Sequence, residues 1–514
     1  MVDVDDIRAC LDGHHEWLLV REFGKTFPLD RTEIEVVSDG DKTLFGFLDD
    51  NGFHSWRLNE ATLSEDEISL DVAGAFGRKR ETIRLVPRVA AAEIAAEIEI
   101  ARLKMANEIA AMIEPSFPGT KLGRVALNVE TGRLAQIQFE TIDQIPMAAI
   151  ADVTGKLTSE VLMTAAMLWL EKLGARKKKP VLEIWIICEK RSSRNTQKLH
   201  ALLTEKWKAK ITIITIDRKL DPPRLIELPK RKIRDLWREK ATKLVIPANP
   251  MPSETAHKII GLAPEKIDII YSKQGETMRF MGLPFARVRS ILGQEKAWFG
   301  VGKNRSILAA ESAEHLENLV AELELNRSPS ATNKRHEFYR TAPEAWLESI
   351  LRRNIKLLDA NVILSPIYNQ FRSSNDKIDL LALRRDGRLV IIELKTQPDR
   401  EMVFQAADYW RKIELQRRRG LLAEANLFGG LDILDKPALV YLAAPAWSFH
   451  RDFEFFAAAV SPEIELWRFE LHEHWRDAVR VVGRMSTSEK KLSAAKRLKK
   501  SKVLFEFPVP FRGH

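Results

Sequence analysis

Two stretches of the chain carry the same order of helix and strand patterns, and this internal repeat restricts the fold more than any other feature. Each reads as a helix, two strands around a glycine turn, a helix, a strand, a helix and a strand. Superposing Gly132–Leu134 on Gly387–Leu389 places Gln138 over Glu393, and the strands that follow then lie at nearly equal spacings. Agreement in order and in spacing favours an internal duplication over coincidence. We therefore predict a mixed α/β protein with two copies of one αβββαβ domain, each preceded by a small β-rich module.

The segments before the two copies differ from them in pattern. Residues 1–88 alternate short apolar runs with turn signals such as Asn51-Gly52, which is typical of a β-rich module. A second β-rich segment begins near Ile267. We predict five parts: a β-rich module over 1–88, a first α/β domain over 89–220, a basic linker with a second β-rich module over 221–335, a second α/β domain over 336–483, and a basic tail over 484–514.

The second copy has the clearer pattern of the two. Its apolar periodicity predicts three helices and four strands. In chain order these are a helix at Pro343–Leu358, strands at Ile378–Leu383 and Leu389–Leu394, a helix at Val403–Gln416, a strand from Ala438, a helix at Phe453–Ala459 and a strand at Ile464–Phe469.

Positive charge is concentrated in one part of the chain. The net charge is +9, but Glu171–Lys243 alone holds 22 Lys and Arg against 9 Asp and Glu. Such a concentration is typical of a surface that binds a polyanion, although a solvated basic face without a partner is the alternative. The candidate nucleic-acid contacts are Arg176, Lys177, Lys178, Lys179, Arg191, Arg194, Lys198, Arg411 and Lys412.

Cysteine content and hydropathy indicate the cellular compartment in which the protein is expected. Cys10 and Cys188 are the only cysteines, which are too few for a disulfide framework and belong to no zinc-binding pattern. The N-terminus lacks the pattern of a signal peptide, and the apolar stretches are too short to span a bilayer. We expect a cytoplasmic protein without a membrane partner.

The residues with the clearest chemistry lie around Glu393. Side chains two apart in a strand share a face, so Glu393 and Lys395 point the same way. A three-residue loop, Arg385–Gly387, with Gly387 in the left-handed position, would set Asp379 directly opposite Glu393, whereas a two-residue loop would turn Asp379 to the other face. Glycine at this position favours the first register.

A third carboxylate is available from Glu348 on the preceding amphipathic helix. Carboxylates a few ångströms apart repel one another unless a cation neutralises them, and oxygen ligands suit Mg²⁺ or Mn²⁺. We therefore expect Glu348, Asp379 and Glu393 to bind a divalent cation. Such a centre could hydrolyse a phosphodiester, and Lys395 could stabilise the charge that develops.

These residues resemble the PD-(D/E)XK, or restriction-endonuclease-like, nuclease superfamily: Asp379, then Glu393-Leu394-Lys395, then a helix. That helix carries Gln405 and Tyr409, which resemble the QxxxY motif of the RecB-like branch. The resemblance implies metal binding by Asp379 and Glu393, assistance to water or to the transition state by Lys395, and support from Gln405 and Tyr409. Ile378 stands where the family name places proline.

A β module before a RecB-like domain also resembles the mismatch-specific endonucleases called NucS or EndoMS. The resemblance implies DNA as a partner and a role of the β module in dimerisation, so a homodimer is an option. It extends to the order of modules only, because no residue in the β modules supports base reading.

The first copy differs from the second at the catalytic positions. With the same three-residue loop, Arg124 stands opposite Gln138, so the set Asp379, Glu393 and Lys395 corresponds to Arg124, Gln138 and Glu140. Such a set cannot hold a divalent cation in the same way. We therefore expect the first copy to be a catalytically inactive nuclease fold.

The sequence thus predicts a metal-dependent deoxyribonuclease, and an endonuclease rather than an exonuclease. Roles in DNA repair and in defence against foreign DNA both fit. Two alternatives remain open. The protein could be a non-catalytic DNA-binding or scaffolding protein whose acidic residues serve packing, or a ribonuclease, because nothing in the sequence distinguishes the sugar.

Overall fold

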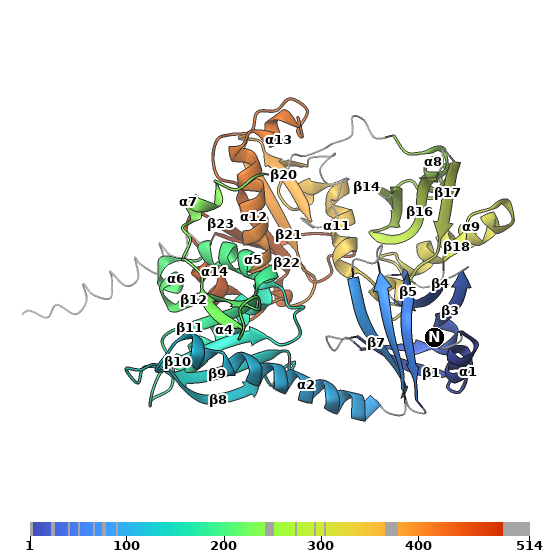
Figure 1. Ribbon diagram of the computed structural model, residues 1–514. Coiled ribbons are helices and arrows are strands. Elements are labelled where there is room, and N and C mark those ends of the chain that lie inside the picture. Colours follow the sequence, from blue (N-terminus) through green and yellow to red (C-terminus); the bar gives the residue numbers. More distant parts are fainter. Residues whose placement is uncertain are drawn as a thin grey trace, which may run out of the picture. The chain divides into compact units, whose positions relative to one another are not determined.

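The computed structural model describes residues 4–21, 26–39, 42–49, 52–64, 67–74, 79–88, 91–241, 251–272, 275–291, 294–302, 305–364 and 379–486. Over these ranges the strands form four sheets, two antiparallel and two mixed (Figure 1). The chain is therefore a mixed α/β protein, as the sequence predicts. It divides into two compact units, here called unit 1 (Met1–Thr196, Lys210–Pro229 and Gly302–Arg305) and unit 2 (Gln197–Ala209, Lys230–Val301 and Ser306–His514).

Unit 1 begins with an antiparallel sheet in the order β2-β1-β7-β6-β5-β4-β3. Alternate side chains, among them Trp17, Phe45 and Phe47, form its core, and Ile7 of helix α1 (Val4–Asp12) packs against them. The strands are β1 (Glu16–Arg21), β2 (Thr26–Asp30), β3 (Ile34–Asp39), β4 (Lys42–Asp49), β5 (Gly52–Leu63), β6 (Ile68–Gly74) and β7 (Lys79–Pro87).

The second sheet of unit 1 is mixed, in the order β13-β12-β11-β10-β9-β8. Its strands are β8 (Lys121–Leu127), β9 (Leu134–Glu140), β10 (Pro146–Asp152), β11 (Ile184–Glu189), β12 (Ile211–Asp217) and β13 (Arg224–Glu227). The helices α2 (Ala91–Ala111) and α3 (Ile113–Ser116) cover one face, where Ile109, Ala149 and Ala151 belong to one buried cluster. Helix α4 (Ser159–Gly174) packs on β10 and β11.

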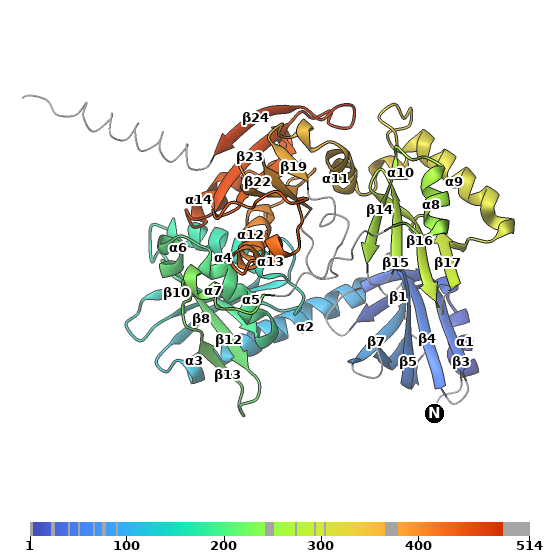
Figure 2. The same ribbon diagram turned by 90° about the horizontal axis from the view of Figure 1, so that it is seen from above.

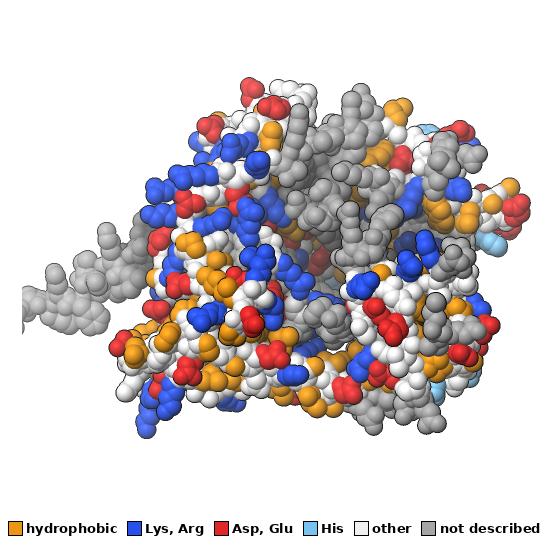
Figure 3. Space-filling model, in the orientation of Figure 1, with side chains coloured by type: hydrophobic (Ala, Val, Ile, Leu, Met, Phe, Trp, Pro, Cys, Tyr) orange, Lys and Arg blue, Asp and Glu red, His pale blue; other side chains and the backbone are white. Residues whose placement is uncertain are grey.

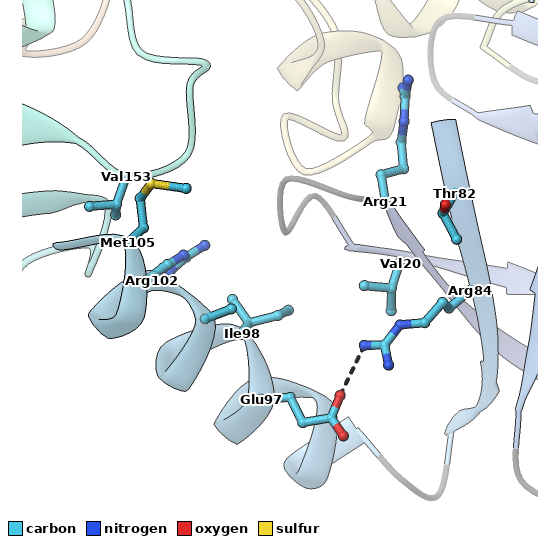
Figure 4. A pocket seen from close by; sticks show the side chains of 10 residues that line it. Val20, Arg21, Thr82, Arg84, Glu97, Ile98, Arg102, Met105 and Val153 are labelled. Atoms are coloured by element: carbon cyan, nitrogen blue, oxygen red, sulfur yellow. Dashed lines mark hydrogen bonds and ion pairs between the residues drawn. The ribbon is translucent and has the colours of Figure 1, made fainter. Parts of the chain in front are cut away.

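A cavity of about 530 Å³ lies between α2 and the first sheet of unit 1. Arg84 of β7 forms an ion pair with Glu97 of α2 at 2.9 Å across one side of it. Figure 4 shows Ile98 and Arg102 of α2 among the side chains that line the cavity. The ion pair ties the helix to the β module that precedes it.

Unit 2 opens with short helices and a five-stranded antiparallel sheet, ordered β14 to β18. Helix α8 (Glu254–Gly261) and helix α9 (Ala313–Asn326) supply Ile259 and Leu316 to its core. The strands are β14 (Ile267–Ser272), β15 (Gly275–Phe280), β16 (Leu283–Ile291), β17 (Gln294–Phe299) and β18 (Ser306–Ile307). Between this sheet and the next lies α10 (Glu337–Arg340).

The last sheet is mixed, in the order β19-β20-β21-β22-β23-β24. Helix α11 (Pro343–Arg353) covers one face through Trp346 and Leu347, and α12 (Met402–Arg418) lies on the opposite face (Figure 2). The other elements are β19 (Val362–Leu364), β20 (Leu380–Arg384), β21 (Leu389–Leu394), α13 (Leu421–Glu424), β22 (Leu439–Pro445), α14 (Phe453–Ala459), β23 (Glu465–Leu471) and β24 (Val481–Ser486).

The two mixed sheets have one topology. In each, the first three strands are antiparallel neighbours, the third, fourth and fifth are parallel, and the sixth is antiparallel. Each sheet also has a helix before the first strand and another between the third and fourth. The predicted tandem pair of αβββαβ domains is confirmed.

The predicted superposition of the copies is wrong by one strand. The apolar pattern does not predict β10 and β19, so it superposes the β8–β9 hairpin on β20–β21. The parallel neighbour of β11 is β10, just as the parallel neighbour of β22 is β21. The counterpart of β21 is therefore β10, a short apolar run that propensity alone does not distinguish from a loop.

Among the described residues no helix is long and apolar enough to cross a membrane. Strand β24 continues to Ser486, into the predicted basic tail. The rest of the tail, from residue 487, lies outside the described residues, as does Ile378.

Candidate active site

The β20–β21 hairpin has the predicted register. Leu380 pairs with Ile392, and Leu383 with Leu389. The loop closes through a 2.8 Å hydrogen bond from the Gly387 N–H to the Arg384 carbonyl oxygen. Gly387 has φ +83°, a left-handed conformation that glycine adopts without steric cost. The three-residue loop is thus confirmed, and its register directs Asp379 and Glu393 to the same face.

Asp379 lies directly before β20 and reaches the main chain of β21. Its Oδ2 accepts a 2.9 Å hydrogen bond from the Leu394 N–H. The carboxylate therefore sits beside Glu393, and its negative charge contributes to raising the pKa of Glu393. Asp379 and Glu393 thus lie next to each other, as the hairpin register predicts.

Glu393 is a buried carboxyl group with one unused oxygen. Its side chain belongs to the continuously buried strand β21, and the residue is 2% exposed. Its Oε2 has no hydrogen-bond partner. Burial, and then the Asp379 charge, raise the pKa of Glu393 well above its ordinary value, although Lys395 acts in the opposite direction. The fold thus holds this acid where its charge is poorly compensated.

Lys395 follows β21 on the same face. Its Nζ lies 3.1 Å from Glu393 Oε1 and 3.4 Å from Asp399 Oδ2. Burial lowers the pKa of Lys395, but the charges of Glu393, Asp399 and Glu344 outweigh it and raise that pKa above the ordinary value. Lys395 is therefore a fixed positive charge beside the two carboxylates.

Glu348 has a cationic partner in the structure. Glu348 is buried and forms an ion pair at 3.5 Å with Arg279 of β15. Arg279 also pairs with Asp268 at 2.8 Å, and Asp268 accepts a 2.9 Å hydrogen bond from Ser349. Glu348 thus belongs to a buried network that joins α11 to the second β module, because a cation from that module meets it there.

Two further acids lie near Lys395 that the sequence motifs do not predict as site residues. Glu344 lies one helical turn before Glu348 on α11, and Asp399 lies in the loop before α12. Both contribute to the raised pKa of Lys395. Glu344 lies four residues before Glu348, a spacing that places both on one face of the helix and could have identified Glu344. No motif in the neighbouring sequence indicates Asp399.

The donor set fits a divalent cation held by two carboxylates. Among the residues that the structure describes, no group of three His, Cys, Asp or Glu side chains is arranged to hold a metal. Mg²⁺ does not require one, because it commonly keeps several waters and takes one or two carboxylates together with phosphate oxygens. A cation at Asp379 and Glu393 would engage the unused Glu393 Oε2 and reduce the repulsion between these acids.

Helix α12 carries Gln405 and Tyr409 one turn apart, both half-buried. The helix is held against the sheet by Trp410, whose Nε1–H donates to the Ala438 carbonyl oxygen at 3.0 Å. The catalytic support that the resemblance implies for Gln405 and Tyr409 stays a prediction.

Several predicted phosphate contacts are engaged within the protein instead. Arg411 is 6% exposed and pairs with Asp408 at 2.7 Å, while Lys412 lies 3.1 Å from the same carboxylate. Lys198 forms a largely buried ion pair with Glu239 at 2.7 Å. On the face shown in Figure 3, Lys and Arg side chains are interspersed with Asp and Glu. The positive charge that is concentrated along the sequence is therefore partly neutralised by acidic side chains in the folded protein.

The remaining predicted contacts lie in unit 1. Arg176, Lys177, Lys178 and Lys179 are exposed in the loop after α4. Arg191 and Arg194 are exposed on α5 (Lys190–Ala201), and the Arg191 guanidinium donates to the Gly155 carbonyl oxygen.

The first copy lacks the paired carboxylates at the corresponding end of its sheet. On β10, the residues facing α4 are Ile150 and Asp152, and the opposing positions of β9 are Gln136 and Leu134. The carboxylate of Asp152 is used locally, accepting from the N–H groups of Thr154 at 2.7 Å and Leu157 at 2.8 Å. The predicted pairing of Arg124 with Gln138 is present, but it lies one strand away from this position.

Comparisons with known proteins add little. No protein family and no curated protein matches the chain. A solved structure entitled "Structure of EndoMS in apo form" matches with 13% identity and a TM-score of 0.15, over 36% of this chain and 83% of that chain. With so low a TM-score, the match carries no argument about fold or function.

Proposed function

We propose that the second α/β domain hydrolyses DNA phosphodiester bonds with Mg²⁺ or Mn²⁺. One observation carries the proposal: Glu393 is buried beside Asp379 with a free oxygen, and Lys395 lies 3.1 Å from its other oxygen. A protein gains no stability from a buried acid whose charge is only partly compensated, and strongly perturbed carboxyl groups next to a cation are common in catalytic centres.

Each side chain has a distinct task in this proposal. Asp379 and Glu393 would hold the cation. When bound, it would polarise the phosphodiester and lower the pKa of a water molecule. The ammonium group of Lys395 would stabilise the negative charge that develops on the phosphate oxygens, and Asp399 would keep that group in place. Gln405 and Tyr409 would support the site from α12.

We propose an endonuclease that acts in the cytoplasm, in repair or in defence against foreign DNA. The test is a cleavage panel with the full chain and Mn²⁺ on single-stranded, duplex, branched and mismatched DNA and on duplex RNA. We expect cleavage of at least one DNA substrate, and at least about a hundredfold loss in Asp379→Asn and in Lys395→Ala.

The rival proposal is a non-catalytic DNA-binding or scaffolding protein. One observation favours it: Glu348 forms an ion pair with Arg279, so this acid serves the packing of α11 on the second β module. The rival proposal would replace the enzyme proposal if no substrate were cleaved and Mn²⁺ did not bind. Cleavage of RNA alone would establish the ribonuclease alternative.

A further inference from the structure

A basic cavity of about 420 Å³ lies in the first α/β domain. Its walls are the edge strand β8, the neighbouring strand β9 and the loop after α4. Five cationic side chains line it, and Glu140 is the only carboxylate that does; the cations are Lys121, Arg124, Arg176, Lys178 and Lys179. Such an excess of one charge in one concavity attracts anions.

A β-bulge directs two of these cations to the same face. Lys121 pairs with Glu140, Arg124 pairs with Gln138, and the register shifts between them at Gly123. Residues three apart in a regular strand face opposite sides, so the extra residue turns Lys121 and Arg124 to one side. A side chain at Gly123 would lie 2.9 Å from the Gln138 carbonyl oxygen, which leaves room only for glycine.

The loop cations are held in place by polar partners on β9. Arg176 Nη1 donates to Gln138 Oε1 at 2.8 Å, and Lys179 Nζ lies 2.6 Å from Glu140 Oε1. The hydrogen bond from Lys179 and its charge lower the pKa of Glu140. Lys179 has φ +49°, a conformation that costs energy in a residue other than glycine. The loop is thus arranged around the cavity.

Three cations remain for a ligand. No ion pair among the described residues engages Lys121, Arg124 or Lys178, and all three are exposed. Arginine and lysine side chains around one concavity match the oxygens of phosphate groups. Contacts of these cations with a nucleic-acid backbone would not depend on sequence, because phosphate groups are the same in every nucleotide.

We propose that this cavity is a second nucleic-acid site, which binds phosphodiester groups of the DNA on which the second α/β domain acts. The inference rests on the proposed function for the choice of DNA as the polyanion. The site consists of residues of the first copy and needs no metal ion.

The test measures binding by fluorescence anisotropy of a labelled DNA duplex in EDTA, with Asp379→Asn as the background so that no strand is cut. The variant is Lys121→Ala/Arg124→Ala/Lys178→Ala. We expect its affinity to fall at least about tenfold at low salt, and the slope of log K against log salt to decrease by about 2 to 3, since each lost phosphate contact contributes about 0.9.

The matched control is Lys334→Ala/Arg335→Ala/Lys356→Ala, which removes two lysines and one arginine that are exposed in unit 2. It should keep the affinity and slope of the background protein. Circular dichroism and thermal unfolding check that both triple variants fold. Single-stranded DNA and duplex RNA serve as further ligands, and poly-glutamate as a competitor.

The proposal is overturned if the background protein does not bind DNA, if the control loses as much affinity as the variant, or if poly-glutamate displaces DNA at equal charge concentration. Because binding is measured without metal, these outcomes differ from failure of the proposed function, which would show as absent cleavage with unchanged binding.

Discussion

Glu393 shows what burial does to one acid. In solution a carboxylate is stabilised by water, whereas Glu393 has lost that water and faces Asp379. Lys395 compensates for only part of the charge, because it is bonded to the other oxygen and shared with Asp399. The residue is therefore sensitive both to pH and to a cation.

We expect Glu393→Gln to stabilise the metal-free protein near pH 8 by at least about 1 kcal/mol, with a smaller effect near pH 5. The pKa of Glu393 is raised in the folded state. Hence the unfolding free energy of the wild type falls as pH rises from the ordinary value of 4.5 through the folded pKa, and stays low above it. Thermal unfolding across this range measures the difference.

With Mn²⁺ present, we expect the wild type to become more stable than Glu393→Gln. We expect Mn²⁺ to raise the melting temperature of the wild type but not of Glu393→Gln, because a ligand stabilises only the state that binds it. Equal stabilisation of both proteins by Mn²⁺ would place the cation elsewhere.

Arg279 provides a second prediction at this scale. It is 4% exposed and neutralises Asp268 and Glu348. We expect Arg279→Met to cost about 3–5 kcal/mol in urea unfolding, because the buried Glu348 loses this cation, whereas Asp268 keeps Arg352 at 3.4 Å. Lys258→Met, which removes an exposed pair with Glu254, should have no measurable effect.

The same network predicts the role of Glu348. Glu348→Gln should lower stability while leaving Mn²⁺ affinity within about twofold of the wild type, because its partner is Arg279. Isothermal titration with Mn²⁺ decides this. A loss of affinity as large as in Glu393→Gln would restore Glu348 as a metal ligand.

The turn between β15 and β16 packs closely against another segment. Gly282 has φ +82°, and a Cβ there would lie 1.9 Å from the Ala345 carbonyl oxygen of α11. This turn therefore sets how closely the second β module approaches α11.

We expect Gly282→Ala to destabilise unit 2 by about 3 kcal/mol, since it adds both strain and a steric clash. The control is Gly261→Ala at the end of α8, where nothing lies within 4 Å of the new methyl group. Urea unfolding should show little change or a small gain for the control. Similar values for both variants would contradict the close packing of this turn.

At the scale of the whole molecule, two copies of one topology have diverged. The second keeps two carboxylates beside a lysine at the end of β21, and the first has Ile150 and Asp152 at the end of β10. Asp152 organises the turn that follows it through hydrogen bonds to Thr154 and Leu157. The fold was thus retained without the paired acids.

We predict different effects for one acid from each copy, Asp379 of the second and Asp152 of the first. Asp379→Asn should abolish cleavage with little change in stability. Asp152→Asn should lower stability by about 1–2 kcal/mol through its lost hydrogen bonds and leave the cleavage rate within about twofold below the melting temperature. Cleavage assays and thermal unfolding on both variants check this. Loss of cleavage in a folded Asp152→Asn protein would assign a catalytic part to the first copy.

Local chemistry by itself determined the β20–β21 hairpin. The glycine at position 387 selected the loop, the loop set the register, and strand alternation then placed Asp379, Glu393 and Lys395 on one face. The duplication was also readable, because apolar periodicity records the order of helices and strands.

Only the tertiary structure decided which strands of the two copies correspond and which charged side chains form ion pairs with distant segments. The equivalence of β10 with β21 depends on parallel pairing to a strand across an intervening helix. The partner of Glu348 is Arg279, which comes from another module, and Lys198 meets Glu239 in the same long-range way. Turn chemistry acts over a few residues and can be read from them, whereas an ion pair between distant segments exists only once the chain has folded.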